Sequence, residues 1–248
     1  MDLKFYKYQG TGNDFVMVDD RAGEFDDQNL SLVKEICDRK FGIGGDGLIL
    51  IRTHSKLDFE MVYFNADGSQ SMCGNGARCA VAFSKFLGIT SGKTNFLAID
   101  GPHEAIISSN EVELKMANVD KVLPSGKDVF VDTGSPHHIR MVEDVKNYQV
   151  FEQGKQVRNH ESYSPKGTNV NFVQEISDSR IFVRTYERGV ENETLSCGTG
   201  VTAAALAYGK KEGSQTVKIE TLGGQLSVKF KRNTDGSFQD IWLIGPAK

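Results

Sequence analysis

A motif that occurs twice constrains the fold of this chain more than any other feature. Residues 73–80 read CGNGARCA and residues 197–204 read CGTGVTAA, and their first cysteines are 124 positions apart in a chain of 248 residues. In each copy a strand-like segment precedes the cysteine and an Ala-rich helical segment follows it. We therefore interpret the chain as a duplication in which Cys73 and Cys197 occupy equivalent positions.

The similarity of the two halves extends beyond the cysteines. At the same offset, segment 44–50 corresponds to 168–174 and segment 58–65 corresponds to 182–189. Each half then reads turn, strand, strand, acidic loop, cysteine and helix. A match over this length is a stronger indication of duplication than a short Gly-rich match alone.

Composition and charge narrow the class of protein. Hydrophobic residues make up 39% of the chain and charged residues 25%, which is typical of a globular protein. The net charge of −4 argues against a nucleic-acid partner. No apolar run approaches the ~18 residues that a membrane span needs, and the N-terminus lacks a signal-peptide core. We expect a cytoplasmic protein without a nucleic-acid or membrane partner.

The four cysteines indicate neither a disulfide framework nor a zinc site, because no CxxC pair occurs. We therefore expect reduced thiols and no bound metal. Cys37 lies in an amphipathic segment, and Cys79 has Ala203 at its counterpart position. Both are predicted to be core residues.

The helices that follow the two motifs are predicted at 75–87 and 200–208, and they are apolar on nearly all sides. Such helices must be buried. The predicted fold class is therefore α+β, with two pseudo-symmetric domains, each a curved, mainly antiparallel sheet wrapped around a central helix.

The domain boundaries follow from this organisation. The first domain is predicted at 1–117, completed by a C-terminal strand at 240–248, and the second at 118–239. The segment 117–127 is the candidate linker because it contains proline and glycine, and the polar segment 154–166 is predicted to be a surface loop.

The glycines after each cysteine suggest a chemical purpose. Backbone N–H groups at a helix N-terminus can hold a carboxylate if the side chains there are small. The same helix end lowers the pKa of a thiol from its free value of about 8.5. One such motif is as well explained by a tight turn with an inert cysteine, but two matched copies favour an acid–base pair.

The sequence closely resembles the diaminopimelate epimerase family over essentially its whole length. The segments that carry the resemblance are 12–16, 41–47, 64–68, 72–79, 136–137, 169–172, 186–189 and 197–200. The resemblance implies two domains with a central helix each and an active site in the cleft between them.

The resemblance also implies a reaction. It is the inversion of one α-carbon of LL-2,6-diaminopimelate to the meso isomer, a step in lysine and peptidoglycan precursor biosynthesis, with no cofactor and no pyridoxal phosphate. Of Cys73 and Cys197, one as thiolate removes the α-proton and the other as thiol delivers a proton to the opposite face. Because the pair shares one dissociable proton, its titration belongs to both residues together.

Further site residues are carried over by the same resemblance. Glu187 and Arg188 match the pair that binds the distal ammonium and carboxylate, and His137, together with Glu187, matches groups that tune the thiol pKa values. The α-carboxylate and the rest of the substrate are assigned to Gly74, Asn75, Gly198, Thr199, Asn13, Asn65 and Asn169.

Two departures from the family pattern occur. Ser135 stands where the family commonly has Asn, so that an amide contact is lost or replaced by a hydroxyl. The loop from Gly189 to Thr194 is one residue longer than usual, and Asn192 is expected to take the positive φ that glycine often supplies there.

Three other readings stay open. A proline or hydroxyproline racemase of the same fold would leave Glu187 and Arg188 without a purpose, because its substrate has no distal charges. A thiol redox protein is a poor fit without a CxxC pair. A non-catalytic anion-binding module would not lose function on alkylation of its thiols. Family members are often dimers, so a homodimer is compatible with the resemblance.

Overall fold

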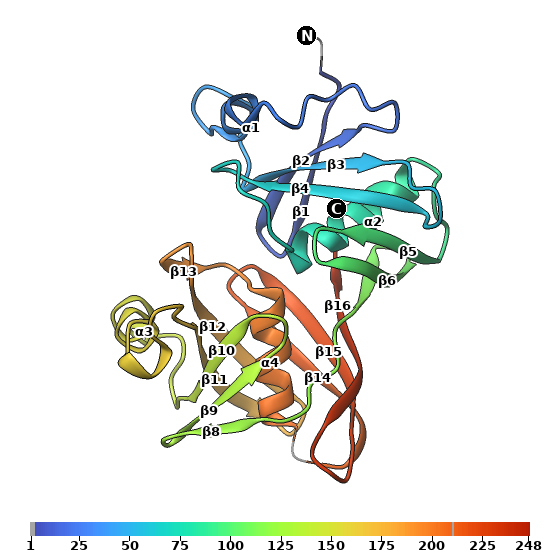
Figure 1. The fold of residues 1–248 in the computed structure, drawn as a ribbon. Helices are drawn as coiled ribbons and strands as arrows, with labels where there is room; N and C mark the ends of the chain where they lie inside the picture. Colours follow the sequence, from blue (N-terminus) through green and yellow to red (C-terminus); the bar gives the residue numbers. More distant parts are fainter. Residues whose placement is uncertain (1–2, 210) are drawn as a thin grey trace. The chain divides into compact units, whose positions relative to one another are not determined.

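The computed structural model describes residues 3–209 and 211–248, which form two compact units (Figure 1). The first unit contains the chain up to Leu114 together with Gly245–Lys248, and the second contains Lys115–Ile244. Residues 1 and 2, on which the signal-peptide prediction partly rests, lie outside the described residues. Each unit is described here by itself.

The first unit is built on strands in the order β1-β2-β3-β4-β5-β6-β7. Pairs β2–β3 and β4–β5 are parallel, and the other neighbours are antiparallel. The strands are β1 Tyr6–Gly10, β2 Asn13–Asp19, β3 Gly47–Arg52, β4 Phe59–Asn65, β5 Lys93–Ala98, β6 Gly101–Ser108 and β7 Glu111–Lys115, and the helices are α1 Leu30–Cys37 and α2 Gly74–Phe86.

The second unit has the order β16-β15-β14-β12-β11-β10-β9-β8, with β13 paired to β12. Here β10–β11 and β12–β14 are the parallel pairs. The strands are β8 Leu123–Ser125, β9 Asp128–Asp132, β10 Pro136–Met141, β11 Asn169–Ser177, β12 Arg180–Glu187, β13 Asn192–Thr194, β14 Gly213–Thr221, β15 Gly224–Arg232 and β16 Phe238–Pro246, and the helices are α3 Val150–Arg158, η1 Glu161–Tyr163 and α4 Gly198–Tyr208.

The helices α2 and α4 form the centres of the two units, as predicted. Helix α2 contacts β1, β2, β3, β4 and β6, and α4 contacts β9, β10, β11, β12, β14 and β15. Nearly all residues of α4 are buried, as expected for a helix without a polar face. A single helix can contact so many neighbouring strands only if the sheet wraps around it, and Figure 1 shows α4 enclosed in this way. The α+β prediction is confirmed.

The register of the strands refines the duplication. In the first unit Gly47 lies opposite Asn65, and in the second Asn171 lies opposite Thr185. The first residues of these pairs differ by 124 in number, but the second residues differ by 120. The alignment of 58–65 with 182–189 was therefore four residues out of register. The connection from β12 to the second cysteine is longer by that amount and contains β13.

The candidate linker is not a free segment. Val119 is only 4% exposed and pairs through its backbone with Phe238, and β8 lies within 117–127. The prediction from proline and glycine content was wrong because Val119 and its neighbours complete the hydrophobic core of the second unit.

The segment 154–166 is not a simple surface loop either. Its first part belongs to α3, which packs on β11 and β12, and its second part contains η1. The polar composition concealed the helix because few of its side chains are apolar. Val150 and Val157 face the core, and between them Gly154 lies against Tyr186.

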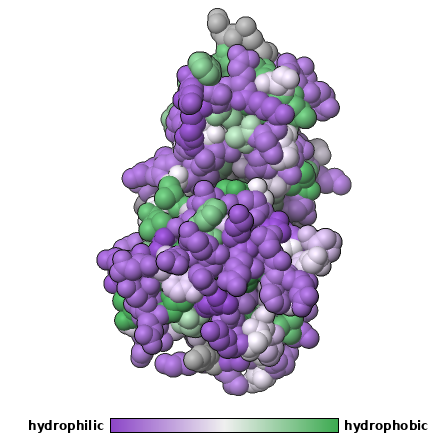
Figure 2. Space-filling model, turned by 90° about the vertical axis from the view of Figure 1, so that its left-hand side faces the viewer, coloured by the Kyte–Doolittle hydropathy of each residue, from purple (hydrophilic) through white to green (hydrophobic). Residues whose placement is uncertain are grey.

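The surface agrees with the composition. The face in Figure 2 is mostly hydrophilic, with small, separate hydrophobic patches. Among the described residues, no helix is both long enough and apolar enough to cross a membrane.

Substitution of Gly154 by alanine tests the packing of α3. The added Cβ would lie 2.3 Å from the Cβ of Tyr186, which cannot move without shifting β12. We expect Gly154→Ala to reduce the free energy of unfolding by about 1–3 kcal/mol, although alanine favours helix formation. Gly92→Ala is the control, since no atom lies within 4 Å of its added Cβ. Equal urea unfolding midpoints for the two variants would contradict this packing.

Candidate active site

Cys73 occupies the N-cap position of α2, as the sequence predicted for a cysteine at a strand-to-helix transition. Its backbone is extended, and its Sγ accepts a hydrogen bond from the N–H of Gly76 at 3.4 Å. The side chain is half-buried. The sulfur thus takes the position of a capping oxygen, next to the N–H groups of the first turn, which have no partner within the helix.

Asn13 and Asn75, two of the predicted substrate-binding residues, lie beside this thiol. The Cys73 Sγ is 3.6 Å from Asn13 Oδ1, and the Nδ2 of Asn75 donates to the same oxygen at 3.4 Å. Asn13 in turn donates through Nδ2 to Asp46. Because a carboxylate only accepts hydrogen bonds, Asp46 fixes the orientation of the Asn13 amide and directs its oxygen to the cysteine.

Asn65, at the end of β4, binds the loop that leads to Cys73. Its Oδ1 accepts from the Tyr63 hydroxyl at 2.8 Å, and its Nδ2 donates to the hydroxyls of Ser69 and Ser71, each at 3.1 Å. The amide predicted to bind substrate therefore also orders the approach to the first thiol.

Cys197 is the N-cap of α4 and is 7% exposed. Its Sγ lies 3.5 Å from the hydroxyl of Thr199, which is itself 3.0 Å from His137 Nε2. The second unit therefore brings together three predicted residues: the thiol, the threonine and the histidine.

The tautomer of His137 follows from Asn171. The Nδ2 of Asn171 donates to the carbonyl of His138 at 3.2 Å and also contacts His137 Nδ1 at 3.1 Å. An amide nitrogen only donates, so Nδ1 is the acceptor and Nε2 carries the hydrogen toward Thr199. Burial, and next the charge of Arg188, lower the pKa of His137 from 6.5 to about 3. His137 is therefore neutral, and Thr199 connects it to the cysteine.

Asn169 connects three predicted segments of the second unit. Its Oδ1 accepts from the backbone N–H of Arg188 at 2.9 Å, and its Nδ2 donates to the Ser135 hydroxyl at 2.9 Å and the Pro136 carbonyl at 3.0 Å. The serine that replaces the family's asparagine is thus a partner of Asn169. Glu187, which directly precedes Arg188, accepts a hydrogen bond from the Thr194 hydroxyl at 3.0 Å.

The loop after β12 differs from the prediction in one respect. Positive φ values occur at Gly189 and Glu191, with φ of 93° and 56°, whereas Asn192 was expected to take this conformation. Asn192 begins β13 and lies opposite Glu187, so its backbone is extended. Because Asn192 pairs with β12, the left-handed conformation occurs one residue earlier than expected, at Glu191.

Sequence reasoning missed Asp46, Asn171 and Arg78 as partners of the predicted site residues. Asn171 could have been found, because it is two positions after Asn169 on the same strand and so points to the same face. Its environment also explains a glycine of the motif, since a Cβ at Gly200 would lie 2.4 Å from Asn171 Oδ1.

The other two cysteines are core residues, as predicted. Cys37 is 3% exposed and Cys79 is fully buried. Burial raises the pKa of the Cys37 thiol to about 11 and that of Cys79 to about 12. Both are therefore protonated and unreactive at neutral pH.

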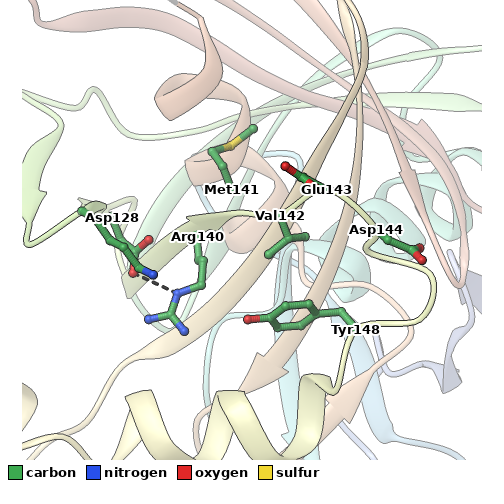
Figure 3. A pocket seen from close by; sticks show the side chains of 8 residues that line it. Asp128, Arg140, Met141, Val142, Glu143, Asp144 and Tyr148 are labelled. Carbon is green, nitrogen blue, oxygen red and sulfur yellow. Dashed lines mark hydrogen bonds and ion pairs between the residues drawn. The ribbon is translucent and has the colours of Figure 1, made fainter.

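Within residues 3–209 and 211–248, no group of three or more His, Cys, Asp or Glu side chains could hold a metal ion. A pocket of about 490 Å³ lies on the second unit beside Asp128, Arg140 and Tyr148 (Figure 3). The Arg140 guanidinium there is already paired with Asp128 at 2.9 Å. None of the predicted site residues lines this pocket, so it is not the candidate active site.

The comparison with known proteins agrees with the geometry of the two cysteine motifs. The family model described as diaminopimelate epimerase matches residues 5–122 and 129–247, one match for each half. The chain belongs to the diaminopimelate epimerase family. The diaminopimelate epimerase of Flavobacterium psychrophilum is 49% identical over 99% of this chain and 97% of its own length. The diaminopimelate epimerase of Aquifex aeolicus is 43% identical over 98% of this chain and 94% of its own length.

Solved structures show that the fold of this epimerase family is shared more widely. A phenazine biosynthesis protein of the PhzF family from Bacillus anthracis covers 100% of this chain and 97% of its own, with a TM-score of 0.79 and 13% identity. The match to a hydroxyproline epimerase from Agrobacterium vitis covers 99% of this chain and 90% of that protein, with a TM-score of 0.71 and 15% identity. At these identities the likeness extends to the fold alone.

The buried neutral state of His137 predicts acid sensitivity. The unfolded chain binds a proton below pH 6.5, whereas the folded protein does not until about pH 3, so stability is fully present above that window and is lost as the pH falls through it. We expect His137→Gln to make urea unfolding less dependent on pH between these limits, by up to about 1.4 kcal/mol per pH unit. The exposed His160→Gln is the control, and identical slopes for His137→Gln and wild type would exclude this assignment.

Proposed function

We propose that this protein interconverts LL-2,6-diaminopimelate and meso-diaminopimelate without a cofactor, using Cys73 and Cys197 as a thiolate–thiol pair. Family membership supports the substrate, and two N-cap cysteines in the same relation to the central helices of two units support the chemistry. Inversion requires a base on one face of a carbon and an acid on the other. A duplicated motif supplies two chemically similar groups that can exchange these roles with the direction of reaction.

The α-carboxylate is proposed to bind at the two helix N-termini, through N–H groups of Gly74, Asn75, Gly198 and Thr199. Removal of an α-proton places negative charge on the α-carbon and its carboxylate. Preorganised N–H groups stabilise charge that develops in the transition state, and they need no reorganisation during the reaction. A positioned base contributes only about 10²–10⁴ in rate, so this electrostatic contribution is necessary.

The distal end of the substrate, with its ammonium and carboxylate, is proposed to bind Glu187 and Arg188. Asn169 accepts a hydrogen bond from the backbone N–H of Arg188, which fixes the chain at this point. The guanidinium, whose Nη1 donates to the Lys166 carbonyl at 3.5 Å, is proposed to bind the carboxylate. Asn13 and Asn65 are proposed to contact the substrate from the first unit. His137 and Glu187 are proposed to tune the thiols, His137 by orienting the Thr199 hydroxyl toward Cys197.

The proposal places the reaction in lysine and peptidoglycan precursor biosynthesis, in the cytoplasm, with no nucleic-acid partner. A homodimer is the oligomer that the family suggests. These finer statements rest on family membership and on the net charge of −4.

Loss of either thiol tests the two-base chemistry. We expect Cys73→Ala and Cys197→Ala each to abolish epimerisation, because one face of the carbon then has no proton carrier. Proton NMR of LL-diaminopimelate in heavy water should show deuterium entering the α-position with wild type and no added cofactor. Cys37→Ala, at the buried C-terminal end of α1, is the control for cysteine loss and should still epimerise. Turnover by either catalytic variant would contradict the assignment.

The distal-end assignment is tested at Arg188. We expect Arg188→Ala to raise the KM for diaminopimelate by at least about tenfold, because a charged hydrogen bond to the carboxylate is lost. The backbone contact to Asn169 remains in this variant, so the unfolding midpoint should change little. An unchanged KM would refute the role of the guanidinium.

A further inference from the structure

Arg78, on the second turn of α2, is a fully buried cation in the first unit. Its guanidinium donates to the Gly74 carbonyl at 3.4 Å, to Thr11 Oγ1 at 3.2 Å and to Asn75 Oδ1 at 3.0 Å. Its Nε has no hydrogen-bond partner among the described residues. All three acceptors are neutral, and no ion pair of Arg78 occurs in that part of the chain.

An arrangement of this kind is costly to stability. Arginine stays protonated in proteins, and a buried charge without a counter-charge loses far more solvation than neutral hydrogen bonds restore. The fold nevertheless makes room for it, since a Cβ at Gly10 would lie 3.3 Å from Arg78 Nη2. A buried cation that is accommodated but not neutralised by a carboxylate suggests that another anion forms beside it.

The titratable groups around Arg78 identify this anion. Burial lowers the pKa of the Arg78 guanidinium, and a negative charge on Cys79 or, with the smaller effect, on Cys73 would raise it. Cys79 is fully buried, its pKa is raised to about 12, and Tyr8 beside it also has a raised pKa. Both groups are neutral at physiological pH. Cys73, half-buried at the helix N-cap, is the remaining group that can carry the negative charge.

The second unit provides an internal comparison. Thr202 has the position in its motif that Arg78 has in the first, and its hydroxyl donates to the Gly198 carbonyl at 2.9 Å. Arg78 makes the equivalent bond to Gly74. Both side chains therefore bind the carbonyl of the residue after the cysteine, but Arg78 is positively charged and Thr202 is not.

We propose that Arg78 is a positioning residue that stabilises the thiolate of Cys73, so that in the substrate-free protein Cys73 is the base and Cys197 carries the proton of the pair. The inference rests on the proposed function, in which these two thiols share one proton. It adds the location of that proton, and it makes the two halves chemically distinct before substrate arrives.

One contact opposes this assignment. Asn13 Oδ1 lies 3.6 Å from Cys73 Sγ, an arrangement that suits a protonated thiol. The S–H group is a weak donor, and a full charge in a low-dielectric interior is worth more than one long contact of this kind. The guanidinium also orients the Asn75 amide, whose Nδ2 donates to the same Asn13 oxygen and reduces its negative charge.

Site-resolved alkylation of the substrate-free protein by iodoacetamide, read by mass spectrometry, tests the proposal. Because the thiolate is the reactive form, wild type should be alkylated first at Cys73. Arg78→Met removes the charge and keeps most of the volume of the side chain. We expect this variant to lower the alkylation rate of Cys73 by at least about tenfold, as for the loss of one charge-stabilising interaction. The pH at which Cys73 becomes reactive should also rise.

Three comparisons separate charge from packing. Cys197 in the same Arg78→Met sample reports the general condition of the protein, and its rate should not fall. Arg78→Lys keeps a cation without the planar fork and should restore part of the Cys73 rate. Thr202→Val removes the equivalent backbone contact in α4 and should leave the Cys73 rate at the wild-type value. Circular dichroism and the unfolding midpoint check that each variant folds.

Two results would overturn the inference. An unchanged rate of Cys73 alkylation in folded Arg78→Met would show that the guanidinium does not stabilise the thiolate. If the KM for diaminopimelate also rose in that variant, the guanidinium would instead be assigned to substrate binding. First alkylation of wild type at Cys197, which is less exposed than Cys73, would place the thiolate in the other unit. Both overturning results are alkylation rates of the substrate-free protein, so neither depends on whether the protein epimerises diaminopimelate; only the comparison of KM values does.

Discussion

The structure depends on one constraint: a cysteine must cap a helix that has no polar face. Such a helix can only lie inside a sheet that wraps around it, so its first turn is fixed by the packing of the whole unit. Cys73 and Cys197 both have extended backbones at the N-cap, with φ of −129° and −118°. Each cysteine is thereby held by the core at the start of a helix, beside N–H groups that have no partner within the helix, and not by a loop that could move independently.

The environments around the two caps differ more than the motif suggests. The first thiol lies among groups that are charged or bonded to charges, since Asn13 is bonded to Asp46 and Asn75 to Arg78. The second contacts Thr199, which is bonded to a neutral histidine. The duplicated motif gives the same geometry twice, and the residues around it make the pair unsymmetrical. An enzyme that holds one proton on two thiols benefits from such asymmetry, because a defined resting state removes the inactive forms with both thiols or neither protonated.

Most of the fold was accessible from sequence because it follows from local patterns. The apolar helices, the cysteines at their starts and the burial of Cys37 and Cys79 all follow from residue type and spacing. What failed depended on tertiary context. Val119 joins a core that no local pattern shows, and groups around the cysteines, such as Asp46, which binds Asn13, come from segments distant in the chain. A single buried arginine in a small-residue motif likewise has no signal in periodicity that distinguishes it from a surface residue.

The structural neighbours show where specificity must be encoded. A PhzF-family phenazine biosynthesis protein, a hydroxyproline epimerase and a methylitaconate-delta-isomerase share this fold with the chain at 13–15% identity. Two capped helices in wrapped sheets therefore do not determine a substrate. Within this chain the two halves differ in one connection: the segment from Thr185 to Cys197 is four residues longer than that from Asn65 to Cys73, and it folds back as β13 against Glu187. Asn169 accepts a hydrogen bond from the backbone N–H of Arg188, and Thr194 donates one to the Glu187 carboxylate, so both residues are held in place. Under the proposed function they would meet the two distal charges of the substrate on a rigid support.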